Sequence, residues 1–181
     1  MLFAQWAGMG DALDSSGSLA QTGTVFNNPG FAAHQGFIQT ITPDYNPGSV
    51  AVKGFVPSAG DSVQASITWS APHYYYNLYD LTTHYASGAL ISRYDQAPDN
   101  STAEIMSERS FIHGHVARLS DFQTVHVNGA TSYWSGGSAG FVNNPHHYSV
   151  TMVNDANTRA LATTSNLNSN SDFTNTWRHC S

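Results

Sequence analysis

The chain has 181 residues, which is enough for one domain with a hydrophobic core. Only 10% of the residues are charged, and six Lys and Arg against twelve Asp and Glu give a net charge of −6. This balance excludes nucleic acid and anionic membranes as partners, because both bind to basic surfaces that this chain lacks.

Turn-forming residues divide the chain into short segments of alternating polar and apolar residues. Gly, Pro, Asn and Asp cluster between these segments, for example at Asn27-Asn28-Pro29-Gly30 and Asn46-Pro47-Gly48. The sequence predicts strands near Leu19–Phe26, Gln35–Ile41, Ser62–Ser70, Tyr74–Leu81, Ala89–Tyr94, Thr102–Ser107, Phe122–Val127, His147–Val153, Ala160–Thr164 and Asp172–Trp177. Strands and turns at this spacing are typical of an antiparallel β-sandwich.

Residues 103–108 place two carboxylates on one side of a predicted strand. Because side chains alternate along a strand, Glu104 and Glu108 point to one side and Ile105 points to the other, toward the core. The two glutamates then stand ~13 Å apart, which is too far for them to share a proton. One of them must work with another partner, and the upstream amide of Gln21 can donate to an oxyanion. Alternatively, Gln21 and Glu108 are ordinary polar residues on a solvated sheet face.

Seven segments of the chain resemble, in their order and spacing, the glutamic peptidases, also called eqolisins. Each segment is a weak signal alone, but together they span most of the chain. The last two are similar to the closing strands of the prokaryotic-type members. The segments are Gln5-Trp6-Ala7-Gly8-Met9-Gly10, Leu19-Ala20-Gln21-Thr22-Gly23, Gly60-Asp61-Ser62-Val63-Gln64-Ala65-Ser66, Tyr79-Asp80-Leu81-Thr82-Thr83, residues 103–108, Tyr148-Ser149-Val150-Thr151-Met152-Val153-Asn154 and Asp172-Phe173-Thr174-Asn175-Thr176-Trp177.

The resemblance implies roles for individual residues. The family's catalytic glutamine falls on Gln21 and its catalytic glutamate on Glu108, whereas Glu104 matches a non-catalytic glutamate. We expect Gln21 and Glu108 to face each other across adjacent strands. The resemblance also places Trp6 at the mouth of the cleft, just ahead of a Gly8-Met9-Gly10 turn. The predicted substrate-binding residues are Trp6, Gly8, Asp11, Gly23 and Tyr75, of which Trp6 and Tyr75 could instead pack in the core.

The resemblance also implies a complete architecture. We expect an all-β, concanavalin-like antiparallel sandwich of two bent sheets with a concave cleft, forming a single domain over residues 1–181. Nothing before Phe3 matches the family's N-terminal strands, so we expect an N-terminally truncated member. The family's Trp-Tyr-Glu-like segment is replaced by Phe37–Asp44, so the preference of the cleft for particular substrates cannot be carried over.

The expected function is that of an acid-acting endopeptidase with a Glu general base, a Gln oxyanion stabiliser and a polypeptide substrate. No cofactor is expected, and the His113/His115 and His146/His147 pairs lack the carboxylate or cysteine cluster of a metal site. The resemblance implies a secreted protein, although the chain shows no signal peptide. The alternative function is a non-catalytic module that binds carbohydrate or peptide through exposed aromatic residues. The sequence predicts no oligomeric state.

Overall fold

The computed structural model describes residues 2–10, 17–27, 34–44, 46–93, 100–109, 111–112, 115–134 and 136–180. Over these ranges the regular structure consists of strands and one short 3₁₀ helix, η1 (Phe141–Asn143). The chain divides into two compact units, one of Ala4–Ser107 and one of Met1–Phe3 with Glu108–Ser181. The single domain over residues 1–181 stays a prediction.

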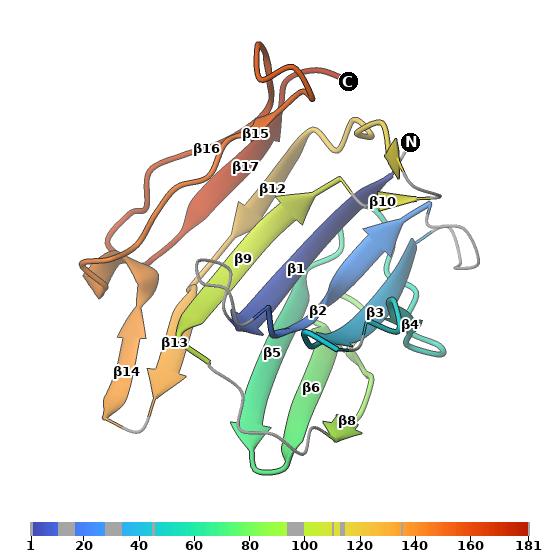
Figure 1. Cartoon of the computed structure of the whole chain (residues 1–181), viewed down its shortest axis with the longest axis vertical. Helices are drawn as coiled ribbons and strands as arrows, with labels where there is room; N and C mark the ends of the chain where they lie inside the picture. Colours follow the sequence, from blue (N-terminus) through green and yellow to red (C-terminus); the bar gives the residue numbers. More distant parts are fainter. Residues whose placement is uncertain are drawn as a thin grey trace. The chain divides into compact units, whose positions relative to one another are not determined.

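Two antiparallel sheets build the first unit (Figure 1). The sheet with the order β4-β3-β2-β1-β9 consists of β1 (Phe3–Gly10), β2 (Leu19–Phe26), β3 (His34–Ile41), β4 (Val50–Ala51) and β9 (Thr102–Glu108). The sheet with the order β5-β6-β7, in which β8 also pairs with β6, consists of β5 (Val63–Ser70), β6 (His73–Asp80), β7 (Tyr85–Ala86) and β8 (Leu90–Arg93).

The core of this unit lies between the two sheets. Ala20 of β2 packs with Tyr74 and Tyr76 of β6, and Met9 of β1 contacts the same cluster. Burial raises the pKa of Tyr76 to about 12, although its hydrogen bond with Thr40 acts in the opposite direction. Side chains from both sheets therefore meet in one apolar layer, and the predicted all-β antiparallel sandwich is confirmed.

Strands β2 and β3 form a regular hairpin. Eight consecutive residue pairs join them, from Leu19 opposite Ile41 to Phe26 opposite His34. Ala20 faces the core, so Thr22 points to the same side and Gln21 points to the opposite side of the sheet. Gln21 lies directly opposite Gln39, which places these two side chains on the same face of the sheet.

The second unit has its own core and sheets. Leu119, Leu161 and Ala162 form a buried cluster against which Phe3 and Phe122 pack, with ring centroids 4.2 Å apart. One sheet has the order β12-β17-β16-β15, and two hairpins pair β10 with β11 and β13 with β14. These strands are β10 (Phe111–Ile112), β11 (His115–Val116), β12 (Thr124–Val127), β13 (Thr131–Trp134), β14 (Gly137–Gly140), β15 (Met152–Val153), β16 (Ala160–Thr164) and β17 (Phe173–Trp177).

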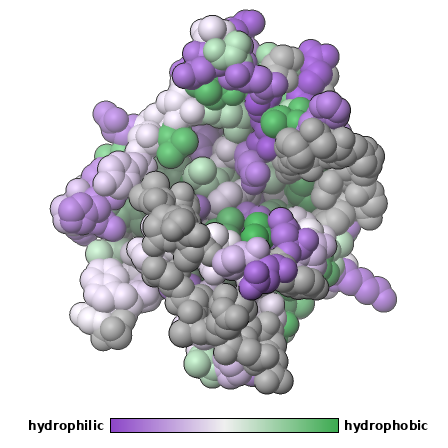
Figure 2. All heavy atoms as spheres, viewed as in Figure 1, coloured by the Kyte–Doolittle hydropathy of each residue, from purple (hydrophilic) through white to green (hydrophobic). Residues whose placement is uncertain are grey.

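The face of the molecule shown in Figure 2 has mixed polarity. In Figure 2, strongly hydrophobic residues form small patches separated by hydrophilic residues. No helix of the described residues is long and apolar enough to cross a membrane. Exposed aromatic side chains do occur, such as Tyr133 and Trp134 on β13.

Asp80 ends β6 and closes the turn that follows it. Asp80 is only 4% exposed, and its Oδ1 accepts the backbone N–H groups of Thr82 at 2.9 Å and Thr83 at 3.0 Å. Burial alone would raise the pKa of Asp80, but the hydrogen bonds from Thr83 and Thr82 and the nearby His84 outweigh it and lower the pKa. The ionised form of Asp80 therefore stabilises the folded state.

We expect this carboxylate to contribute to stability in mild acid and to lose that contribution in stronger acid. The pKa is lower in the folded than in the unfolded chain, so the contribution is present above the ordinary aspartate pKa and disappears as the pH falls through the lowered value. Asp80→Asn keeps an acceptor oxygen but cannot titrate, so its Tm should fall less steeply with decreasing pH. Thermal unfolding of both proteins across the acidic range tests this, and parallel Tm profiles would contradict it.

Candidate active site

The side-chain amide of Gln21 is buried and makes a hydrogen bond through only one of its two polar atoms. Gln21 is only 7% exposed. Nε2 donates to Oε1 of Gln39 at 2.7 Å, whereas Oε1 is buried and has no hydrogen-bond partner. A buried acceptor without a partner costs roughly 1–3 kcal/mol, so such an atom marks a position where a water or a ligand is expected. Gln21 is therefore not solvated on its sheet face, whereas its catalytic role stays a prediction.

Trp6, Gly8 and Gln21 lie on one face of the five-stranded sheet. A side chain built at Gly8 would meet the Trp6 ring at 2.6 Å and the Leu19 side chain at 3.2 Å, so these groups share a face. Leu19 and Gln21 are two residues apart on β2 and point the same way. Trp6 is 6% exposed. The structure thus brings together three of the predicted site residues around a buried indole.

Gly23 is required by the close approach of two strands. A side chain at this position would collide with the carbonyl oxygen of Gln5 and the Cα of Trp6, both in the backbone of β1. Backbone atoms cannot move aside as a flexible side chain can, so only glycine fits here. Gly23 therefore has a structural role beside Gln21, and its contact with substrate stays a prediction.

The two sides of β9 carry different groups. Ser107 Oγ donates to Gln5 Oε1 at 2.5 Å, and Gln5 points to the side of β1 from which Met9 enters the core. Alternation places Ile105 on this same side and Glu104 on the other. The Thr102 hydroxyl lies 2.9 Å from Glu104 Oε1, which holds that carboxylate against its own strand.

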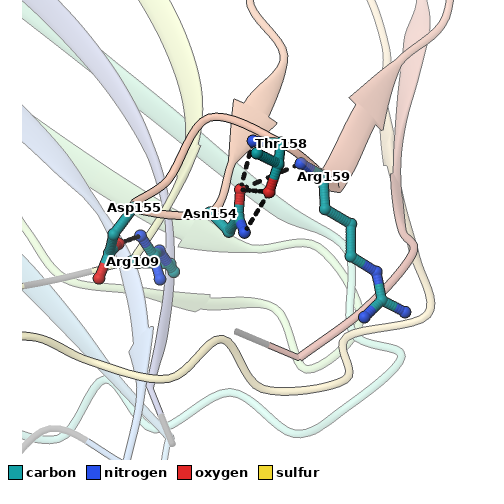
Figure 3. A network of polar contacts seen from close by, with 5 residues as sticks. All are labelled: Arg109, Asn154, Asp155, Thr158 and Arg159. Atoms are coloured by element: carbon teal, nitrogen blue, oxygen red, sulfur yellow. Dashed lines mark hydrogen bonds and ion pairs between the residues drawn. The ribbon is translucent and has the colours of Figure 1, made fainter.

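Glu108 is the last residue of β9 and begins the second compact unit. By alternation it points to the same side of β9 as Glu104. The next residue, Arg109, is 8% exposed at its side chain, and its Nη2 donates to Asp155 Oδ1 at 2.6 Å (Figure 3). Asn154, beside Asp155, accepts two backbone N–H groups of its own turn. A buried guanidinium thus holds the chain next to Glu108 within its unit.

A sequence comparison with protein families identifies the chain. The family described as the Peptidase A4 family matches residues 1–177. The chain belongs to the Peptidase A4 family. No curated protein sequence matches significantly.

Solved structures of glutamic peptidases share the fold of this Peptidase A4 member. Aspergilloglutamic peptidase from Aspergillus niger is similar with a TM-score of 0.79 at 18% identity, over 98% of this chain and 99% of that one. Scytalido-glutamic peptidase with a transition state analog inhibitor has a TM-score of 0.72 at 16% identity, over 98% and 84% of the two chains. The same enzyme with a peptide-based transition state analog gives 0.70 at 18% identity, over 98% and 83%.

The family and the fold agree with the sequence-based identification. The chain is a peptide hydrolase of the Peptidase A4 family, and its resemblance to the glutamic peptidases is confirmed. The roles of individual residues and the truncation at the N-terminus stay predictions.

Three expectations about the Peptidase A4 site differ from the structure. Gln21 and Glu108 were expected on adjacent strands, but β1 lies between β2 and β9 in the sheet order. Tyr75 points away from the core that Tyr74 and Tyr76 enter, so it lies on the outer face of the other sheet and not on the face of Gln21. The predicted Gly8-Met9-Gly10 turn is the end of strand β1.

Two of the predicted residues lie outside the described residues, and one residue at the site was not predicted. Asp11, predicted to bind substrate, and His113 lie outside the residues that the structure describes. Within the described residues, no group of three or more His, Cys, Asp or Glu could hold a metal ion. Gln39, the hydrogen-bond partner of Gln21, was not predicted as a site residue. The pairing of β2 with β3 would have indicated it, but that pairing depends on a register that the sequence alone does not fix.

Proposed function

We propose that this peptidase cleaves polypeptides in acid, with Glu108 as general base and Gln21 as the group that orients water and stabilises the oxyanion. The observation that carries the proposal is the buried Gln21 amide, held at Nε2 and left without a partner at Oε1. That oxygen can accept a hydrogen bond from a water molecule. The second N–H of Nε2, which Gln39 does not use, can donate to an oxyanion.

The proposed reaction takes place in two proton transfers. The Glu108 carboxylate removes a proton from water while the water oxygen attacks the peptide carbonyl. The resulting tetrahedral intermediate carries its negative charge on the former carbonyl oxygen, where the Gln21 N–H donates. Glu108 then returns the proton to the leaving nitrogen as the C–N bond breaks. Because Gln21 and Glu108 lie in different compact units, their pairing belongs to this proposal. Secretion of the protein also stays a prediction.

Digestion of an unfolded protein tests the proposal. We expect new N-termini, detected by mass spectrometry, in acid and a loss of cleavage toward neutral pH. EDTA should leave the rate unchanged, because the proposed chemistry uses no metal. Loss of activity in EDTA and its return with zinc would favour a metal mechanism. Absence of cleavage at every pH would favour the binding module.

A further inference from the structure

A network of hydrogen bonds links Gln21, through Gln39 of β3, to residues 46–49, the segment that leads into β4. Gln39 accepts at Oε1 from Gln21 Nε2 at 2.7 Å and from the Ser49 hydroxyl at 2.9 Å. Gln39 donates from Nε2 to Asn46 Oδ1 at 2.9 Å. The same oxygen of Asn46 accepts the backbone N–H of Gly48 at 3.2 Å. All five residues belong to the unit that contains the two packed sheets.

The backbone N–H of Gly48 determines which atoms donate and which accept throughout this hydrogen-bond network. The N–H of Gly48 can only donate, so the atom of Asn46 that faces it must be the oxygen. That oxygen also faces Gln39, which must therefore present its Nε2 to Asn46 and its Oε1 to the other side. Gln39 Oε1 then requires a donor from Gln21, which fixes Nε2 of Gln21 toward β3. An amide carries its two polar atoms on different sides, so Oε1 of Gln21 turns away from β3.

The Ser49 hydroxyl does not determine this direction. A hydroxyl can donate or accept, so Ser49 would adapt to either orientation of the Gln39 amide. Its place opposite Gln39 follows from the pairing of β3 with β4, in which Ile38 lies opposite Val50. Asn46 is thus the group that selects one orientation, because its oxygen is tied to a backbone donor.

We infer that Gln39 is a positioning residue for the catalytic amide, and that Asn46 sets the orientation that Gln39 passes to Gln21. The inference rests on the proposed function of Gln21. With the direction observed, Gln21 offers its oxygen to water and keeps one N–H for the oxyanion. With the direction reversed, Gln21 would point its oxygen at Gln39 and present only N–H groups, so that it could not accept a hydrogen bond from the attacking water.

Three substitutions at Asn46 test whether kcat depends on the orientation of the Gln39 amide and not only on the presence of a hydrogen bond. Asn46 is exposed, so its substitutions do not disturb the core. Asn46→Asp, assayed at a pH above the ordinary aspartate pKa so that it is ionised, presents only acceptors and keeps the orientation. Asn46→Lys presents only donors and reverses it, and Asn46→Ala imposes neither orientation. We expect kcat to be highest in Asn46→Asp, lower in Asn46→Ala and lowest in Asn46→Lys, which should be about tenfold below wild type. KM should be unchanged in all three variants. Ser49→Ala, which removes a hydrogen bond to Gln39 without changing the direction, is the matched control and should keep the wild-type kcat.

A second measurement reports on the amide independently of catalysis. With ¹⁵N-labelled glutamine, the side-chain NH₂ of Gln21, assigned by its loss in Gln21→Ala, should show one hydrogen-bonded proton in wild type and in Asn46→Asp. That signature should be lost in Asn46→Lys, and Tm values show that each variant is folded. If Asn46→Lys does not fold, the test is the comparison of kcat and of the Gln21 NH₂ signal between Asn46→Ala and Asn46→Asp.

The two proposals fail in different ways. If the wild type cleaves nothing, the proposed function fails, and the NMR signals still report whether Asn46 orients Gln21. If the wild type is active and Gln21→Ala is not, but the folded Asn46 variants agree in kcat and in the Gln21 signal, the positioning role of Gln39 is wrong.

Discussion

Substitution of Glu108 by glutamine is expected to abolish turnover without unfolding the protein. The amide has almost the shape of the carboxylate but cannot take a proton from water or return one to the leaving nitrogen. General acid and base catalysis together contribute up to about 10⁴-fold, so kcat should fall by about that factor. Digestion of an unfolded substrate, followed by mass spectrometry of new N-termini, measures the loss. Circular dichroism and Tm should match those of the wild type.

Glu104→Gln is the matched control for this experiment. Glu104 lies four residues earlier on β9 and points to the same side of the strand, and the Thr102 hydroxyl contacts its carboxylate. The same chemical change at this position should affect stability more than kcat, because the proposed reaction does not use Glu104. If Glu108→Gln retains wild-type activity, or if both variants lose activity alike, the proposed role of Glu108 is wrong.

Removal of the Gln21 amide is expected to lower kcat by about 10² to 10³, the usual effect of losing one oxyanion donor. Gln21→Ala leaves Gln39 Oε1 with its hydrogen bond from Ser49, so the loss of stability should be only about 1 kcal/mol. KM should change little, because the proposed hydrogen bond forms with the oxyanion and not with the bound substrate. Steady-state kinetics and chemical denaturation of the same preparation separate the two effects.

Gln35→Ala controls for the loss of a buried amide from the same hairpin. Gln35 is 8% exposed, close to the 7% of Gln21, and its Nε2 donates to the Val52 carbonyl at 2.9 Å. Its removal should lower the free energy of unfolding and leave kcat nearly unchanged. A similar fall in kcat for both variants would mean that the effect of Gln21→Ala arises from a loosened hairpin.

The sequence predicted the long strands that follow the expected alternation and missed a strand that contains glycines. The bounds of β2 (Leu19–Phe26) and β16 (Ala160–Thr164) were predicted correctly. Strand β1 was missed because Gly8 and Gly10 indicate a turn. A side chain at Gly10 would collide with the backbone of Ser18 and Leu19, so glycine is present there because β2 approaches closely. Such contacts between strands are not visible in a single sequence.

The strand predicted over His147–Val153 shows a second reason why the sequence did not predict every strand correctly. A strand was expected over His147–Val153, but only Met152–Val153 are paired, with a register shift between them. Alternation of side chains predicts an extended conformation, whereas a ladder also needs a partner strand at each residue. The candidate glutamine could be chosen by resemblance. Its burial and its bond to Gln39 could not, because both depend on which residues of β3 lie opposite β2.

The regular hairpin of β2 and β3 has a consequence for the entropy of catalysis. Gln21 and Gln39 face each other within eight uninterrupted residue pairs, so the amide loses its rotational freedom when the chain folds. Substrate binding then need not supply the free energy to order it at each turnover, and more of that energy remains to lower the barrier. The proposed catalytic glutamine would thus be preorganised by the same β-ladder that stabilises the sheet.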